Sequence, residues 1–150
     1  MSERILGLDP GERRIGVAVS DATGTIASPV DFIDRRGGDL EQRLIDLCTE
    51  WEITGVVVGL PMSLDGTEGP AVTRSREFGG LVRGLTGLPV AFHDERFTTV
   101  TAEQALLEGG VKRRSRTNKR DQIAAAVMLQ GFLDKRRYEL GIEHDTDTER

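Results

Sequence analysis

The sequence predicts an α/β protein with a mixed five-stranded sheet flanked by helices. Three strand-like segments come first and lie close enough in the chain to pair as hairpins. Two more follow, each reached through a segment with helical periodicity, and such crossovers give parallel pairing with helices on the sheet faces. Hairpins and crossovers together predict a sheet with both antiparallel and parallel pairs.

Apolar runs and turn residues predict the first three strands. Residues 4–9 (RILGLD) and 14–20 (RIGVAVS) are predicted as strands, and the PGER segment between them contains a Pro-Gly pair that is typical of turns. Residues 25–33 (TIASPVDFI) form a less regular third strand. Pro29 favours an edge position for it, because proline cannot donate a hydrogen bond to a neighbouring strand.

Helices and strands alternate in the rest of the chain. Apolar residues recur at helical spacing from Asp39 to Trp51, and again between Pro70 and Gly87. Residues 55–60 (GVVVGL) are apolar without alternation, which indicates a strand covered on both faces. The other predicted elements are a strand at residues 89–92, a helix at about 99–108 and a final helix at about 120–137.

Composition indicates one soluble domain. The chain has 150 residues, of which 37% are hydrophobic and 30% are charged. No apolar run approaches the ~20 residues of a membrane helix, and the first residues show no signal-peptide pattern. The single cysteine, Cys48, cannot form an internal disulfide, which fits a cytoplasmic location.

The formal net charge of −5 is unevenly distributed. Residues 139–150 carry five acids and one base, and we expect them to form a disordered tail outside a domain of residues 1–138. That domain then has 20 acids and 19 bases. Residues 112–120 (KRRSRTNKR) hold six bases and no acid, which is compatible with a solvated loop or with a surface that binds a polyanion.

Acidic residues follow two predicted strands at the same edge of the sheet. Asp9 ends the first strand, where it could cap the turn or act as a functional carboxylate. Asp94 and Glu95 end the last strand, and successive residues of a strand point to opposite faces. Only one of the two is therefore expected to join Asp9, and spacing does not decide which. Glu95 could instead pair with Arg96 or cap the next helix.

A third acid, Asp121, falls near the start of the final predicted helix. An acid there interacts favourably with the helix dipole, which is its simplest interpretation. Asp121 also shares a helix face with Ala124, Ala125 and Met128, and small residues on that face allow close approach to the sheet. Three acids that converge at one edge would form an oxygen-rich site for Mg²⁺ or Mn²⁺.

Four segments in this order resemble the YqgF/RuvX family: LGLDPGERRIGVAVSD, VVVGLPMSLDGTEGP, HDERFTT and DQIAAAVMLQ. The resemblance covers roughly residues 6–133. It implies a ribonuclease H-like fold. Members are described as Holliday junction resolvases and as nucleases that mature the precursor of small-subunit ribosomal RNA. Gln122 departs from the small serine or threonine that we expect at its position.

The resemblance also implies a mechanism and its residues. Asp9, Glu95 and Asp121 are expected to be the catalytic, metal-binding acids, with Asp94 a structural partner. They would hold two Mg²⁺ or Mn²⁺ ions roughly 4 Å apart, one generating hydroxide and the other stabilising the leaving oxygen. The expected partner is a ribosomal RNA precursor, or else branched DNA. The candidate nucleic-acid-binding residues, each of which could also be ordinary surface charge, are Arg13, Arg14, Arg96, Lys112, Arg113, Arg114, Arg116, Lys119 and Arg120.

Two other functional classes fit part of the sequence. DPGERRIGVAV also resembles the first phosphate loop of sugar kinases and actin-like ATPases, but these enzymes need two related domains and a second such loop. A non-catalytic RNA-binding assembly factor could keep the fold and the acids. The loop at residues 61–69 could line the site with Ser63 or Thr67, or simply connect a strand to a helix.

Overall fold

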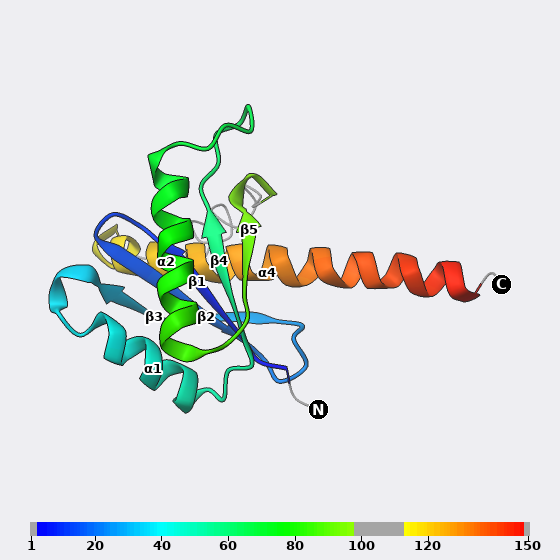
Figure 1. The fold of residues 1–150 in the computed structure, drawn as a ribbon, viewed down its shortest axis with the longest axis horizontal. Coiled ribbons are helices and arrows are strands. Elements are labelled where there is room, and N and C mark those ends of the chain that lie inside the picture. The colour runs from blue at the N-terminus through cyan, green and yellow to red at the C-terminus, as the bar shows by residue number, and fades with distance from the viewer. Residues whose placement is uncertain (1–2, 98–112, 149–150) are drawn as a thin grey trace.

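The computed structural model describes the backbone of residues 3–97 and 113–148 and the side chains of residues 3–96 and 123–140. A sheet lies between α1 and α2 on one face and α4 on the other (Figure 1). The elements are β1 (Ile5–Pro10), β2 (Arg14–Ser20), β3 (Ala27–Asp34), η1 (Arg35–Gly37), α1 (Leu40–Glu50), β4 (Gly55–Leu60), α2 (Pro70–Thr86), β5 (Val90–Asp94), η2 (Glu95–Phe97) and α4 (Arg113–Thr148).

The sheet has five strands in the order β3-β2-β1-β4-β5. The β1–β2 and β2–β3 pairs are antiparallel, whereas β1–β4 and β4–β5 are parallel. This confirms the predicted mixed sheet and places β3, with Pro29, at an edge. The parallel strands β1, β4 and β5 end at one edge of the sheet, called the carboxyl edge below.

Alternation along the strands separates two apolar cores. Leu6, Leu8, Val56 and Val58 pack with residues of α1 and α2. Ile5 and Val57 lie on the opposite face, where they pack with the buried residues of α4. Side chains that alternate along β1 and β4 thus face either the two short helices or α4.

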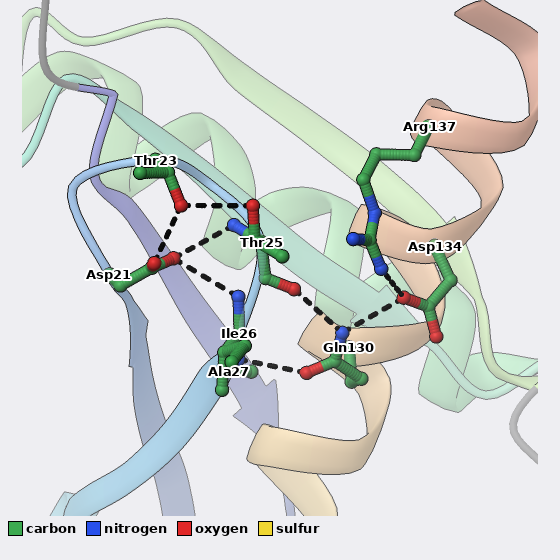
Figure 2. Close-up of polar contacts among 8 residues, drawn as sticks. All are labelled: Asp21, Thr23, Thr25, Ile26, Ala27, Gln130, Asp134 and Arg137. Carbon is green, nitrogen blue, oxygen red and sulfur yellow. Dashed lines mark hydrogen bonds and ion pairs between the residues drawn. The ribbon is translucent and has the colours of Figure 1, made fainter. Parts of the chain in front are cut away.

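Helix α4 lies unusually close to the sheet. A Cβ atom built on Gly7 would lie 2.8 Å from Cβ of Leu129, so only glycine permits this approach of helix to strand. The side-chain amide of Gln130 also joins α4 to β3: its oxygen accepts from the Ala27 N–H at 2.9 Å, and its nitrogen donates to the Thr25 carbonyl at 2.9 Å (Figure 2). The glycine and the amide together fix where α4 crosses the strands.

The final helix differs from the prediction at both ends. The sequence predicted about residues 120–137, but α4 runs from Arg113 to Thr148. The backbone of residues 113–120 is therefore helical rather than a loop, and residues 139–148 continue the helix where we expected a disordered tail. Arginine and lysine are good helix formers despite their charge, which accounts for the extension at residues 113–120. Helix propensity does not account for the extension at residues 139–148, which includes aspartate, threonine and glycine. The helix predicted at about 99–108 lies outside the described residues.

Among the described residues, none of the helices combines the length and apolarity that crossing a membrane requires.

Candidate active site at the carboxyl edge

Asp9 lies near the end of β1, opposite Gly16 of β2. Ile5 and Gly7 face α4, and alternation places Asp9 on that same face. The turn that follows is held by two hydrogen bonds: Gly11 N–H donates to the Arg14 carbonyl at 2.8 Å, and Arg35 Nε donates to the Gly11 carbonyl at 2.9 Å. The backbone on both sides of Asp9 is therefore fixed.

Glu95 reaches the α4 face from the last strand. His93, two residues earlier, is 3% exposed and packs against Phe132 of α4 with ring centroids 6.2 Å apart. Glu95 lies over Gly59 of β4: a Cβ atom built on Gly59 would be 2.6 Å from Oε1 of Glu95 and 3.2 Å from Cγ of Met128. The missing side chain at Gly59 leaves the space that the Glu95 carboxyl group occupies.

Asp9 and Glu95 form a hydrogen-bonded pair of carboxyl groups, called the acid pair below. Burial, the hydrogen bond with Asp9 and the negative charges of Asp9 and Asp94 raise the pKa of Glu95 from 4.5 to about 9. At neutral pH the pair therefore retains one proton, which forms the hydrogen bond between the two carboxyl groups. The shared proton removes the repulsion that two ionised carboxylates would have at this distance.

Asp94, next to Glu95, has a different environment. The backbone N–H and Nε of Arg96 donate to Asp94 at 2.9 and 2.8 Å, and Nη2 makes a third contact at 2.5 Å. These hydrogen bonds lower the pKa of Asp94. Arg96, a predicted phosphate-binding residue, thus already holds Asp94, and the two residues fix the turn that carries Glu95.

The acid pair has the chemistry of a divalent metal site. Two carboxyl groups supply the oxygen ligands that Mg²⁺ and Mn²⁺ prefer, and a cation between them would replace the shared proton. Within residues 3–96 and 123–140, no group of three or more histidine, cysteine, aspartate or glutamate residues could hold a metal ion. The side chain of Asp121, the third predicted ligand, lies outside the described residues.

The backbone of Asp121 is in α4, ahead of two residues that are buried against the sheet. Ala125 is 0% and Met128 is 1% exposed, and they follow Asp121 by one and two helical turns on the same face. Ala124, also predicted for that face, is exposed.

Apart from Arg96 in η2, the predicted nucleic-acid-binding residues that the structure describes lie in or beside the β1–β2 turn and in the first turns of α4. Arg14 begins β2 on the same face as Asp9, with its guanidinium carbon 5.4 Å from the centre of the Phe32 ring. Arg13 is exposed in the β1–β2 turn. Lys112 lies outside the described residues. The remaining members of the basic run lie in the first turns of α4, where only the backbone is described: Arg113, Arg114, Arg116, Lys119 and Arg120.

A hollow beside Asp94 was not predicted from the sequence. Its lining residues come from the ends of β4 and β5 and from α4: Leu60, Phe92, His93, Asp94, Phe132, Lys135, Arg136 and Glu139. The basic run at residues 135–137 was a visible signal in the sequence, but only the packing of α4 on the sheet brings Lys135 and Arg136 into this lining. Gly59 also had a signal, since it interrupts a run of β-branched residues.

Comparison with known proteins gives a family match and several relatives. A family profile described as "RuvX: Holliday junction resolvase" matches residues 3–135. A protein of Ruegeria sp. (strain TM1040) is 43% identical over 135 residues, which cover 89% of this chain and 86% of the relative. A protein of Lactococcus lactis subsp. cremoris (strain MG1363) is 44% identical over 137 residues, covering 89% and 96%. Both carry the name "Putative pre-16S rRNA nuclease".

Solved structures give the fold. The chain superposes on Thermus thermophilus RuvC in complex with a Holliday junction substrate with a TM-score of 0.57 and 16% identity, covering 89% of this chain and 96% of that one. A second Thermus thermophilus RuvC structure gives a TM-score of 0.53. The fold is ribonuclease H-like, as the sequence resemblance implied.

Proposed function

Because the chain belongs to the RuvX family, we propose that it is a metal-dependent nuclease that hydrolyses phosphodiester bonds in the precursor of 16S ribosomal RNA. The names of relatives that are 43% and 44% identical support this substrate. The acid pair is the observation that carries the proposal. Its two carboxyl groups converge from β1 and from the turn after β5, and the pKa of Glu95 is raised by burial and by the neighbouring Asp9.

The acid pair would hold the metal, and α4 would complete the site. Asp9 and Glu95 supply oxygen ligands from two strands whose positions are fixed by the sheet, and Asp121 is the proposed third ligand. When bound, a divalent ion lowers the pKa of a water molecule and stabilises the charge on the leaving oxygen. Asp94 and Arg96 position Glu95 by fixing its turn. The Glu95 carboxyl group must lose its proton before it can bind a cation.

Basic side chains would hold the phosphates on either side of the reacting one. Arg14 lies on the face that carries the acid pair, and residues 113–120 form the first turns of α4, where the helix dipole also favours an anion. Such side chains position the strand without reading its sequence. Changing Arg113, Arg114 and Arg116 to glutamine should reduce the salt dependence of RNA binding, by about 0.7 in log–log slope for each phosphate that is no longer neutralised.

A cleavage assay tests the proposal. Purified wild-type protein, the Asp9→Asn variant and the Glu95→Gln variant are incubated with a 16S ribosomal RNA precursor in Mg²⁺ or Mn²⁺. We expect the wild type to cleave the precursor and each variant to be slower by about 10³-fold or more, because the metal contributes several kcal/mol to transition-state stabilisation. The Asp21→Asn variant, changed at the other end of the sheet, is the matched control and should remain active.

Two results would contradict the proposal. Undiminished cleavage by a folded Glu95→Gln variant would remove the acid pair from catalysis. Tight RNA binding by the wild type without cleavage in either metal would favour a non-catalytic assembly factor. A four-way DNA junction in a parallel reaction tests the activity that the family description names.

A further inference from the structure

Two arginines meet at the β1–β2 turn, which directly follows Asp9. Arg35, in η1, donates from Nε to the Gly11 carbonyl at 2.9 Å. Arg74, in α2, forms an ion pair in which its Nη2 lies 3.6 Å from Oε1 of Glu12, the next residue of the turn. Because the two guanidinium groups contact adjacent residues of one turn, they lie close together. Arg35 and Arg74 are called the arginine pair below.

Packing against α2 holds the arginine pair in place. The guanidinium carbon of Arg35 lies 5.4 Å from the centre of the Phe78 ring, and Phe78 belongs to the core that α1 and α2 cover. Arg74 precedes Phe78 by one turn of α2, so both residues are on the same helix surface. The Arg35 backbone N–H also donates to the Arg13 carbonyl at 2.9 Å. Arg35 is therefore fixed by a ring and by two hydrogen bonds to the turn.

Negative charge does not balance the arginine pair. Within the described residues, the pair forms its ion pair with Glu12, whose side chain is 88% exposed, so that water screens the contact. Asp34 precedes Arg35, but it accepts from the Arg36 N–H at 2.9 Å, and the exposed Arg36 side chain offsets its charge. Burial and the positive charge of Arg74 lower the pKa of Arg35, as expected where like charges meet. An anion at this place would relieve the repulsion.

The arginine pair also keeps hydrogen-bond donors for such an anion. Gly11 uses Nε of Arg35, whereas the two terminal nitrogens of Arg35 form no hydrogen bond with any residue that the structure describes. The side chain of Arg74 is 53% exposed. A guanidinium group has five N–H donors in a planar fork that matches the oxygens of a phosphate. Two such groups with one screened acid between them have the chemistry of a phosphate site.

The β1–β2 turn lies between the arginine pair and the acid pair. Asp9 is on the α4 face of the sheet, whereas Phe78, under Arg35, is in the core on the opposite face. Gly11 follows Asp9 by two residues, so their Cα atoms are within about 7 Å of each other. In Figure 1 the turn and η1 lie side by side at the left of the sheet. A nucleic-acid strand at the acid pair can thus reach the arginine pair by passing over this turn.

We propose that the arginine pair binds a backbone phosphate of the RNA strand, on the far side of the β1–β2 turn from the scissile phosphate. The inference rests on the proposed nuclease function and adds to it the path of the strand. The strand runs from the acid pair on the α4 face, over the turn, to Arg35 and Arg74 on the α2 face. Because the contact is to the backbone, it positions the strand whatever its sequence.

Neutralising single phosphates tests the contact without cleavage. The probes are single-stranded RNA oligonucleotides, each with a methylphosphonate at a different position, and the protein is Glu95→Gln so that the RNA stays intact. Fluorescence anisotropy measures binding. We expect loss of the charge at the contacted phosphate to weaken binding by about tenfold. Arg74→Gln in the same background should weaken binding of unmodified RNA by a similar factor and remove the sensitivity at that position.

Arg83→Gln is the matched control, because it removes an exposed arginine from the last turn of the same helix. It should keep the affinity and the methylphosphonate profile of the parent protein. Arg35 packs on Phe78, so thermal melts accompany its variants. Arg35→Gln should lower the log–log slope of binding against salt by about 0.7, and Arg35→Lys should restore most of that slope. Arg74→Gln decides the test if Arg35→Gln does not fold.

The outcomes separate the arginine pair from the nuclease. Equal affinity and equal methylphosphonate profiles in Arg74→Gln and Arg83→Gln would overturn the phosphate site, and the site would be refuted even if the wild type cleaves the ribosomal RNA precursor. A profile that depends on Arg74, together with a wild-type protein that cleaves nothing, would support the phosphate site while refuting the nuclease.

Discussion

Two carboxyl groups at opposite ends of the sheet have opposite environments. Asp21 follows β2 and accepts hydrogen bonds from the Thr23 hydroxyl at 2.6 Å and from the N–H groups of Thr25 and Ile26 at 2.8 and 3.0 Å (Figure 2). These hydrogen bonds lower its pKa to about 2. Glu95 at the carboxyl edge instead faces another carboxyl group, and its pKa is raised to about 9.

The contrast distinguishes a structural acid from one suited to bind a cation. Asp21 has donors from its own loop, so its negative charge is stabilised by the folded chain. Glu95 is half-buried beside Asp9, and its negative charge becomes favourable only when a cation joins the pair.

Filling the space over β4 should disrupt the acid pair. In a Gly59→Ala variant the new Cβ would lie 2.6 Å from Oε1 of Glu95, so the flexible carboxyl group must move while the strand stays in place. A displacement of about 1 Å can reduce a rate by 10²-fold, and we expect a loss of that order in cleavage. Single-turnover kinetics on the RNA precursor measure it.

Gly84→Ala is the matched control, because nothing lies within 4 Å of a Cβ built there. Alanine is favoured over glycine in a helix by ~1 kcal/mol, so this variant should be fully active and at least as stable as the wild type. Full activity of Gly59→Ala would show that Glu95 does not need its observed position.

The raised pKa of Glu95 predicts how stability depends on pH. The pKa of Glu95 is 4.5 when the side chain is unperturbed, as in the unfolded chain, and about 9 in the folded protein. Between these two values the folded state holds a proton that the unfolded state has released. The contribution of Glu95 to the free energy of unfolding should therefore fall between pH 5 and 9, by up to ~1.4 kcal/mol per pH unit. Glu95→Gln keeps a donor toward Asp9 without titrating.

Urea denaturation of both metal-free proteins across this range measures the difference. We expect the wild type to lose stability relative to Glu95→Gln as pH rises. Parallel pH profiles for the two proteins would mean that Glu95 titrates normally.

Asp21 should show the reverse dependence and a smaller effect. Its folded pKa of about 2 lies below the ordinary 3.8, so its contribution is present above about pH 4 and is lost as pH falls toward 2. Asp21→Ala should lower the melting temperature at pH 7 by a few degrees, because the loop loses an acceptor for three donors. Thermal melts should show this difference shrinking at acid pH, with cleavage activity unaffected. If Asp21→Ala lost cleavage activity but kept its stability, the structural role of Asp21 would be contradicted.

The sequence predicted the sheet and part of the site because both depend on local patterns. Alternation along β5 predicted that only one of Asp94 and Glu95 would face Asp9, and the structure confirms that it is Glu95. Apolar runs and the Pro-Gly turn predicted the hairpin that carries Asp9. These features are determined by residues that are close to one another in the sequence.

Other features depend on contacts between distant segments. The space over Gly59 exists because Glu95 and Met128 meet there, and no local pattern predicts that meeting. Arg96 donates to Asp94 through Nε and Nη2, a contact that depends on the η2 turn and that the sequence did not predict. The early start of α4 reflects helix-forming basic residues that the charge pattern alone suggested were a loop.

Calorimetric titration of metal-free protein with Mn²⁺ at pH 7 tests the central claim most directly. The titration is repeated in two buffers of different ionisation enthalpy, which gives the number of protons released on binding. Because the acid pair retains a proton at pH 7 and must lose it to bind a cation, we predict release of about one proton per protein, and release of none with weaker binding in Glu95→Gln. Binding of Mn²⁺ without proton release, or with equal affinity and equal release in Glu95→Gln, would contradict the assignment of the acid pair as the metal site.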